Sequence, residues 1–431
     1  MRRWSTAPGW SIVLDDRGLA LSRRTFEAVI SVPRDAASEV LAHINGDTDS
    51  LSPVGRTVLT NLDQHGVLAA EVVHDEQVMA RHEPGARSVR RGPESGWVHP
   101  VRPRPATHLR LGPDGPELSG NGSGDRIVLA SVRAAEFAAR LIAQVDLGDV
   151  GEVENELLGL MSRARLLVTA EPADVTATWE FHDSVFHTAT RMDTSFGDYG
   201  AKREPRPFHP GVAVPRPAGE HRLRLHHDVH ASKGLTLREA VSARSTVRDH
   251  GGAPIGRAEL SALLDSSLRI RKLECTATSQ RAWRAIPNGG ALSGLSAVVL
   301  AGEVSDLARG AYEYDALGHD LAPAHGPAPA LARWFGLAER LTGISGDTIQ
   351  AMILFTLDYD RPAHSYDSIV YATALKEVGA ALEAMALVSV DRGLSFCPMG
   401  GGFGTTTGLG NGIRSAAVVG EAVVGRPRGE S

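Results

Sequence analysis

From Leu235 onward, segments with helical apolar spacing alternate with short apolar runs, and this pattern constrains the fold more than any other feature of the chain. The spacing predicts helices at 236–243, 257–264, 331–342, 348–355 and 371–390, and strands at 295–301 and 415–424. Interleaving of this kind is typical of an α+β domain with a mixed or antiparallel sheet. We therefore predict one enzyme-sized α+β domain over residues 235–431.

Residues 1–178 contain one outline twice, namely a strand, two amphipathic helices and a closing strand. The helical spacing occurs, in chain order, at 36–44, 54–62, 134–144 and 153–164. Two helices followed by a β hairpin are typical of a winged helix, so we predict winged-helix-like units at 1–105 and 106–178. Residues 179–234 are rich in proline and histidine without a steady period, and are predicted to connect these units to the α+β domain.

Composition and charge exclude several classes of function. A formal net charge of −6 at pH 7 gives no global basic field that would attract nucleic acid. Two cysteines, Cys275 and Cys397, are too few for a disulfide framework or a thiolate zinc site. His182 and His187, at i and i+5, do not share a helix face, so we predict no metal site. No stretch approaches the ~18 apolar residues of a membrane span, and we predict a cytoplasmic protein.

Three short clusters have side chains or glycines that suit ligand binding. Arg244, Ser245 and Arg248 follow a predicted helix, and two guanidinium forks with a hydroxyl can grip a phosphate. The same residues also fit a solvated helix end. The turn at 287–290 has two glycines, which let the backbone approach a flat ring. The glycine triplet at 400–402 can offer bare backbone amides to an acceptor atom.

In this order, the three clusters resemble the SagB-type branch of the FMN-dependent nitroreductase family, which includes the azoline dehydrogenases of ribosomal peptide biosynthesis. Residues 179–191 are similar to the Phe-His-x-x-x-Phe-His-x-x-x-x-Arg stretch that precedes the flavin domain in that branch. Residues 375–387 resemble its Leu-x-Glu-x-Gly-His-x-x-Gln-Asn-Leu helix, although Ala380, Glu383 and Ala384 stand here in place of the His, Gln and Asn. The resemblance implies an α+β, nitroreductase-like flavin domain that is preceded by two winged-helix-like peptide-clamp units.

The resemblance also implies an FMN site. In this family an Arg-Ser-x-x-Arg motif holds the FMN phosphate and ribityl chain, a Pro-Ser-Gly-Gly loop approaches the isoalloxazine across a homodimer interface, and a Gly-Gly-Phe loop gives an amide near N5. The implied cofactor-binding residues of this chain are Arg244, Ser245, Arg248, Pro287, Asn288, Gly289, Gly290, Gly400, Gly401 and Gly402. A basic residue near the C-terminus commonly reaches the phosphate in this family, and Arg426 or Arg414 can serve here.

The Lys-Tyr pair to which the family's proton abstraction is credited is only partly present. Tyr366 stands where the tyrosine is expected, whereas Ser365 stands where the lysine is expected. Azoline oxidation removes a proton from Cα and a hydride from the neighbouring ring carbon, so the resemblance implies hydride transfer to FMN, with dioxygen as the final acceptor. We predict Tyr366 as the catalytic base, with His364 or an unpaired arginine as a substitute for the lysine. Tyr366 also fits a purely structural position at a helix start.

The implied function is oxidation of thiazolines or oxazolines to azoles in a ribosomally made peptide. The N-terminal units would bind the leader of the precursor peptide by strand addition, and a cyclodehydratase would be a partner. DNA binding is disfavoured, because the second predicted helix at 54–62 has a single arginine. The incomplete Lys-Tyr pair leaves one alternative, a catalytically impaired nitroreductase-fold scaffold within a heterocycle-forming complex.

Overall fold

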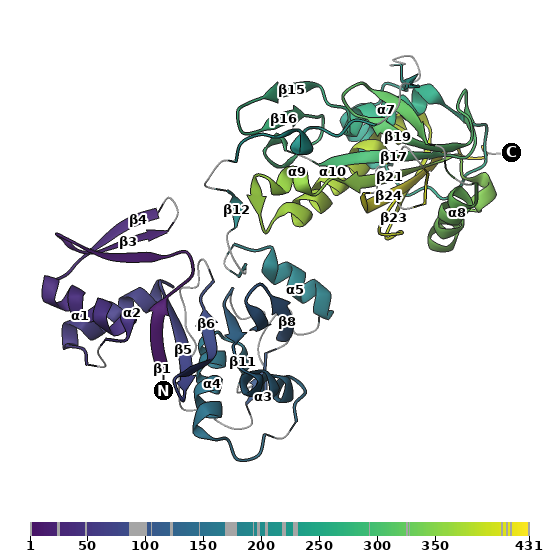
Figure 1. Ribbon diagram of the computed structural model, residues 1–431. Coiled ribbons are helices and arrows are strands. Elements are labelled where there is room, and N and C mark those ends of the chain that lie inside the picture. Colours follow the sequence, from purple (N-terminus) through teal and green to yellow (C-terminus); the bar gives the residue numbers. More distant parts are fainter. Residues whose placement is uncertain are drawn as a thin grey trace. The chain divides into compact units, whose positions relative to one another are not determined.

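The computed structural model divides the chain into two compact units (Figure 1). The first comprises residues 1–204 with 367–369, and the second comprises 205–366 with 370–431. The structure describes residues 2–429 except 24–25, 48–49, 86–100, 105, 121–123, 146, 169–178, 193, 196–198, 203–205, 218–220, 227–231, 293, 325, 327, 407, 411–412 and 414–415. Among the described residues, no helix combines the length and the apolar character that a membrane crossing requires.

The first unit combines antiparallel sheets with short amphipathic helices. Its strands are β1 (Arg2–Thr6), β2 (Ser11–Asp15), β3 (Gly18–Arg23), β4 (Phe26–Ser31), β5 (Leu68–His74), β6 (Gln77–Glu83), β7 (Arg102–Pro103), β8 (His108–Gly112), β9 (Gly115–Ser119), β10 (Arg126–Leu129), β11 (Leu167–Val168) and β12 (Gly200–Ala201). Its helices are α1 (Arg34–Asn45), α2 (Pro53–Gln64), α3 (Val132–Ile142), α4 (Glu152–Arg163) and α5 (Phe181–Ala189). Helices α1 to α4 confirm the four helices that the apolar spacing predicts in this region.

One sheet joins strands from both predicted N-terminal segments. Its order is β1-β5-β6-β10-β9-β8, and β6 pairs antiparallel with β10, which places His82 opposite Ile127. Two cores pack around it, one with Val40 of α1 and Leu62 of α2, the other with Leu158 of α4. The predicted units at 1–105 and 106–178 thus share a sheet, because periodicity reveals the faces of a strand but not its partner. Their winged-helix character stays a prediction.

The second unit contains the two longest helices and the largest sheet among the described residues. Its helices are α6 (Leu237–Ala243), α7 (Arg257–Ser267), α8 (Ala328–Thr342), α9 (Asp360–Ala363) and α10 (Val370–Arg392), with single 3-10 turns η1 (Pro210–Val212), η2 (Gly289–Ala291) and η3 (Gly346–Thr348). Its strands are β13 (Leu223–Arg224), β14 (Ile255–Gly256), β15 (Lys272–Cys275), β16 (Gln280–Trp283), β17 (Leu295–Ala301), β18 (Val304–Ser305), β19 (Gly310–Asp315), β20 (Asp320–Ala324), β21 (Ala351–Leu357), β23 (Ser395–Met399) and β24 (Ala417–Gly425). A further short strand is β22 (Tyr366–Asp367), of which Tyr366 belongs to the second unit and Asp367 to the first.

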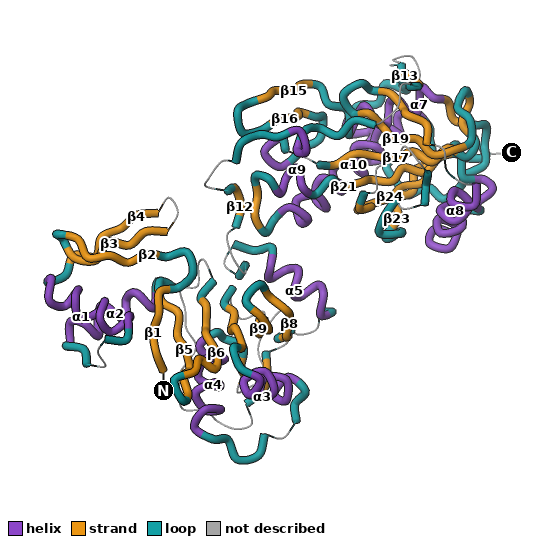
Figure 2. The backbone as a smooth tube through the Cα atoms, viewed as in Figure 1, coloured by secondary structure: helices purple, strands orange, loops and turns teal. Residues whose placement is uncertain are grey.

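The seven-stranded sheet of the second unit has the order β13-β20-β19-β17-β21-β24-β23, and Figures 1 and 2 show its central strands side by side. Neighbouring strands in this order are antiparallel, which confirms one of the two predicted sheet types. Successive residues of a strand point to opposite faces. Val299 of β17 accordingly packs in the core with α7 and α10, whereas Val298 and Leu300 pack in the core with α8. Burial on both faces explains why 295–301 is one continuous apolar run.

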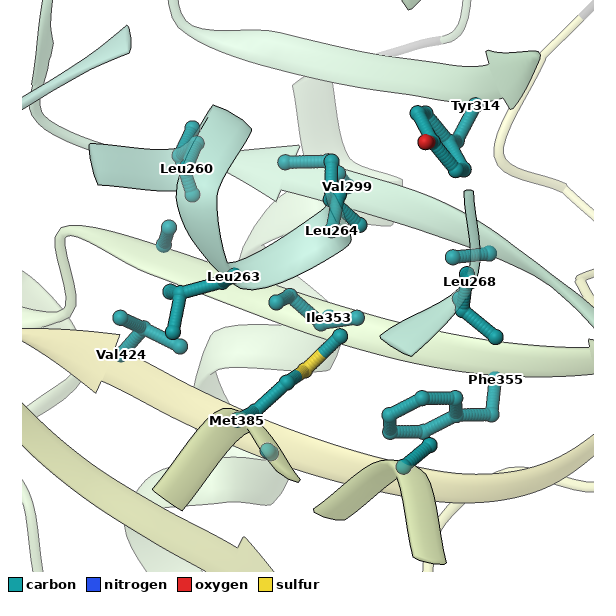
Figure 3. Packing of buried hydrophobic residues seen from close by; sticks show 14 of the residues in the cluster. Leu260, Leu263, Leu264, Leu268, Val299, Tyr314, Ile353, Phe355, Met385 and Val424 are labelled. Carbon is teal, nitrogen blue, oxygen red and sulfur yellow. The ribbon is translucent and has the colours of Figure 1, made fainter. Parts of the chain in front are cut away.

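Helices α7 and α10 cover one face of this sheet. Leu260, Leu263 and Leu264 recur at i, i+3 and i+4, which places them on one side of α7, facing the strands (Figure 3). Met385 of α10 reaches the same core, next to Ile353 of β21 (Figure 3). This packing fixes α10 against the sheet, and α10 in turn positions the loop described below.

The predicted helix at 348–355 is wrong, because Ala351–Leu357 forms strand β21. All residues of this strand are buried, and it lies between β17 and β24 in the middle of the sheet. A short apolar run that is buried on every side has no polar face, so its spacing does not distinguish a buried helix from a central strand. Burial on both faces of the sheet is the physical reason for the error.

Candidate functional site

Helix α6 carries the arginine cluster at its C-terminal end. Thr236 and Glu239 form a capping box that begins the helix: the main-chain N–H of Glu239 donates to Thr236 Oγ1 at 3.3 Å, and the main-chain N–H of Thr236 donates to Glu239 Oε2 at 2.8 Å. Hydrogen bonds from Thr236 lower the pKa of Glu239 below its ordinary value. The helix ends at Arg244, whose φ of −60° and ψ of 124° are no longer helical. The cluster is therefore held on an extended segment just after a well-capped helix.

This extended segment runs antiparallel to β23, the strand that precedes the glycine triplet. The main-chain N–H of Val247 donates to the carbonyl of Phe396 at 3.0 Å, and the hydroxyl of Ser395 donates to the carbonyl of Asp249. Because residue numbers rise along one segment while they fall along the other, the two segments are antiparallel. This direction takes residues 244–245 toward the end of β23 that the glycine triplet follows.

The guanidinium groups of Arg244 and Arg248 are free to bind a ligand. Both side chains and that of Ser245 are exposed, and neither guanidinium has an ion pair or hydrogen bond with another residue that the structure describes. Burial raises the pKa of the Cys397 thiol, and the positive charge of Arg248 opposes this rise, which places Arg248 beside β23. Two uncommitted guanidinium groups and a hydroxyl form a donor set that suits a phosphate.

The glycine triplet 400–402 is exposed at the end of β23. Nothing lies within 4 Å of the position that a Cβ would take at Gly400 or Gly401, so the main chain is open there. A Cβ at Gly402 would overlap the carboxylate of Glu421 on β24, so a side chain at this position would displace that carboxylate. Burial raises the pKa of Glu421 to about 7, which places a carboxyl group that titrates near neutrality against the loop.

The turn at 287–290 is tied to strand β16 and to the beginning of α10. The side-chain Nδ2 of Asn288 donates to the carbonyl of Ala282 at 3.0 Å. The main-chain N–H of Gly289 donates to Glu377 Oε1 at 2.8 Å, and Glu377 is buried in α10. These two hydrogen bonds fix the loop from both sides, and the second explains why a carboxylate is buried in this helix.

Of the two predicted catalytic residues, the structure brings only Tyr366 to this loop. Its hydroxyl lies against Gly290, in the space that a Cβ there would need. His364 is buried, its Nε2 lies 3.3 Å from the carbonyl oxygen of Arg206, and its ring packs edge-on against His209 with centroids 5.3 Å apart. The catalytic role of His364 therefore stays a prediction. Its Nε2 already lies beside a backbone carbonyl.

A cavity of about 480 Å³ opens beside the loop. It is lined by Arg281, Trp283, Arg284, Ala285, Ile286, Pro287, Asn288, Gly290 and Ala291. This lining contains two guanidinium groups and no carboxylate, so the cavity has a positive field. Its remaining surface is mainly apolar, as is usual for sites that bind small molecules.

Arg284 is a cavity residue to which the sequence patterns assign no role. Its Nε and Nη1 atoms are buried and have no hydrogen-bond partner among the described residues. A buried donor without a partner costs about 1–3 kcal/mol. Burial lowers the pKa of Arg284 to about 10 against the opposing effect of the negative charge of Glu377, and at this value the group is still a cation at neutral pH. In the sequence it is one arginine among many, and only its burial reveals it.

Arg426, the basic residue near the C-terminus that is predicted to reach the FMN phosphate, already has another partner. The guanidinium of Arg426 forms an ion pair with Glu259 of α7, and its main-chain N–H donates to Gln350 Oε1 at 3.1 Å. Its predicted contact with the FMN phosphate would require this ion pair to be shared or broken, and it stays a prediction. Arg414 lies outside the described residues.

The predicted site residues thus fall into two groups. In the first group, the segment of the arginine cluster lies along β23, and β23 continues into the glycine triplet; in the second, Tyr366 and the cavity adjoin the 287–290 loop. No hydrogen bond between described residues joins the two groups. The first group fits FMN, because it offers free cationic donors for a phosphate and open main-chain amides for acceptor atoms of a ring.

No protein-family model and no curated protein matches the chain. Among solved structures, a protein from Anabaena variabilis described as a candidate nitroreductase is 15% identical, with 99% of this chain and 80% of that chain covered and a TM-score of 0.41. The microcin synthetase McbBCD complex of E. coli with truncated pro-MccB17 bound is 15% identical over 52% of this chain and 78% of that chain, with a TM-score of 0.34. A nitroreductase with bound FMN from Desulfitobacterium hafniense is 13% identical over 45% of this chain and 90% of that chain, with a TM-score of 0.28. At these TM-scores the similarity assigns neither a fold nor an activity to this chain.

Proposed function

We propose that this chain is an FMN-dependent oxidoreductase of the SagB type that oxidises azolines to azoles in a ribosomally synthesised peptide. One observation carries the proposal: the segment 244–249, with its two uncommitted guanidinium groups, runs antiparallel to β23, the strand that the open glycine triplet follows. The motif resemblance assigns the FMN phosphate to the arginines and the flavin ring to the triplet. The geometry supports this because the two motifs lie far apart in the sequence but on adjacent segments of the fold.

The residues of the arginine cluster would bind and orient the cofactor. Arg244 and Arg248 would donate charge-assisted hydrogen bonds to the FMN phosphate, and Ser245 would add a hydroxyl donor. The open amides of Gly400 and Gly401 would donate to acceptor atoms of the ring. When bound, FMN supplies the acceptor for a hydride from the azoline ring carbon next to Cα.

Tyr366 would move the proton. Its hydroxyl oxygen, held against Gly290, would accept the proton from Cα of the azoline in its deprotonated form. With the proton and the hydride gone, the single bond between Cα and its neighbouring ring carbon becomes a double bond, and the substrate has lost two hydrogen atoms. Tyrosine is a weak base near neutrality, but aromatisation of the product makes the Cα proton more labile, which lowers the demand on the base.

The assembly would involve a second copy of the chain and a peptide. By the resemblance, the 287–290 loop would complete the flavin site of the partner in a homodimer.

In the first unit, β2, β3 and β4 form a three-stranded antiparallel sheet in which β2 and β4 are the edge strands. An edge strand presents unpaired main-chain groups that can pair with an extended peptide, so this sheet would bind the leader of the precursor. A cyclodehydratase would supply the azoline.

The test is turnover of an azoline peptide by the purified protein. We expect the product to be lighter by two hydrogen atoms per ring in a mass spectrum, and denatured protein to release FMN. Tyr366→Phe should keep FMN but slow azole formation by about 10²–10⁴-fold. Ser365 in place of the family's lysine favours the scaffold alternative, which a colourless protein that FMN does not reconstitute would support.

A further inference from the structure

The cavity beside the 287–290 loop contains a polar group that the proposed function does not use. Arg284 lines this cavity, and its buried Nε and Nη1 have no hydrogen-bond partner among the described residues. The charged or titratable groups that act on it are Glu377 of α10, Tyr314 of β19 and Arg361 of α9. None of them accepts a hydrogen bond from either of the two buried nitrogens. A buried donor without a partner calls for a ligand, an ion or a water that accepts from it.

We propose that Arg284 makes this cavity a binding site for the carboxylate or acyl oxygen of a flat heterocycle. A guanidinium presents its N–H groups as a planar fork that matches an oxygen acceptor, and Arg281 adds a second positive charge to the same lining. No carboxylate in the lining competes for the fork. Trp283 and Ile286 supply apolar surface against which a flat ring can pack.

The identity of the heterocycle rests on the proposed function, which this inference deepens. In an azoline peptide the ring carbon Cα bears the acyl carbon of the next peptide bond. When the base removes the Cα proton, the electron pair of the broken C–H bond moves toward the acyl oxygen and makes it negative. When the neighbouring carbon loses its hydride to bound FMN, the electron pair would return and form the ring double bond. Fixed donors aimed at the oxygen stabilise this charge.

The experiment measures binding of thiazole-4-carboxylate to the full-length protein by calorimetry, with Trp283 fluorescence as a second readout. We expect the wild type to bind the carboxylate and not thiazole itself, which has no acyl oxygen. Arg284→Gln should weaken binding about tenfold or more. Arg284→Lys keeps the charge without the fork and should bind with intermediate affinity. Arg271→Gln, which changes an exposed arginine outside the lining, should bind like the wild type.

The outcomes separate this inference from the proposed function. Equal affinity of the wild type and Arg284→Gln, or of thiazole and its carboxylate, would overturn the cavity assignment even if the protein forms azoles. Loss of carboxylate binding in Arg284→Gln alone would support the assignment even if the protein proves to carry no flavin. If Arg284→Gln does not fold, judged from its melting curve, Arg284→Lys decides: affinity equal to that of the wild type would overturn the need for a fork.

Discussion

The hydroxyl of Tyr366 occupies the space that a Cβ of residue 290 would need. Gly290 has a φ of 58°, in the left-handed region that residues other than glycine rarely adopt. The loop and the tyrosine therefore depend on each other: glycine at 290 leaves room for the hydroxyl, and the hydroxyl meets the loop at a residue that lines the cavity.

Gly290→Ala should displace Tyr366 and strain the loop. We expect a loss of about 1–2 kcal/mol in the free energy of unfolding, together with slower azole formation. Urea denaturation and a turnover assay would measure the two effects. Gly379→Ala is the matched control, because Gly379 lies in α10 with open space around its Cβ position, and alanine there should stabilise the helix by up to about 1 kcal/mol. A Gly290→Ala protein as stable and as active as the wild type would rule out the contact.

Glu377→Ala should loosen the same loop from the other side. It removes the acceptor of the Gly289 N–H, which is 2.8 Å away, and it removes the negative charge nearest to Arg284. We expect a loss of about 1–3 kcal/mol in unfolding free energy. Glu383→Ala, at an exposed position of the same helix, should stay within about 0.5 kcal/mol of the wild type. Equal losses in the two variants would show that the hydrogen bond to Gly289 contributes nothing.

Glu421 should make stability depend on pH. Burial raises its pKa from the ordinary 4.5 to about 7, so between these values the folded chain holds a proton that the unfolded chain has released. Its contribution to stability is therefore fully present below pH 4.5 and is lost as pH rises to about 7. Glu421→Gln should raise the melting temperature at pH 8 more than at pH 5. The corresponding difference in the free energy of unfolding should be on the order of 1–3 kcal/mol. A difference that does not change with pH would mean that Glu421 titrates normally.

Arg163 should be the most sensitive charged position of the first unit. Its Nε donates to His82 Nδ1 at 3.3 Å, and His82 Nε2 lies 3.0 Å from Asp125 Oδ2. Arg163 also forms an ion pair with Asp63, so the network connects α2, α4 and β6. Arg163→Ala leaves buried polar groups without their partner and should cost about 3–5 kcal/mol. Arg140→Ala, at an exposed position of α3, should cost less than about 0.5 kcal/mol; similar losses would contradict the network's importance.

Local signals in the sequence predicted most helices correctly, because amphipathic spacing is a property of neighbouring residues. Leu260, Leu263 and Leu264, for example, mark the buried side of α7. The helix predicted at 348–355 is wrong for a physical reason, since a strand that is buried on both faces shows no polar alternation. The pairing of β6 with β10 was also inaccessible, because strand partners are set by contacts that are distant in the sequence.

The candidate site was predictable as motifs but not as an arrangement. Composition and turn chemistry pointed to Arg244, Arg248 and Gly290, whereas the antiparallel course of 244–249 along β23 appears only in the structure. The sequence patterns do not single out Arg284, because only its burial distinguishes it from the other arginines. A single arginine before a turn does not reveal that burial.

The FMN content of the purified protein tests the central claim most directly. The account predicts that the wild type binds FMN, that Arg244→Ala weakens FMN binding about tenfold or more, and that Arg238→Ala, which changes an exposed arginine on the same helix, leaves it unchanged. Released flavin would be quantified by absorbance after denaturation and by titration of added FMN. Full FMN occupancy in Arg244→Ala, or a wild type that does not bind added FMN, would contradict the account.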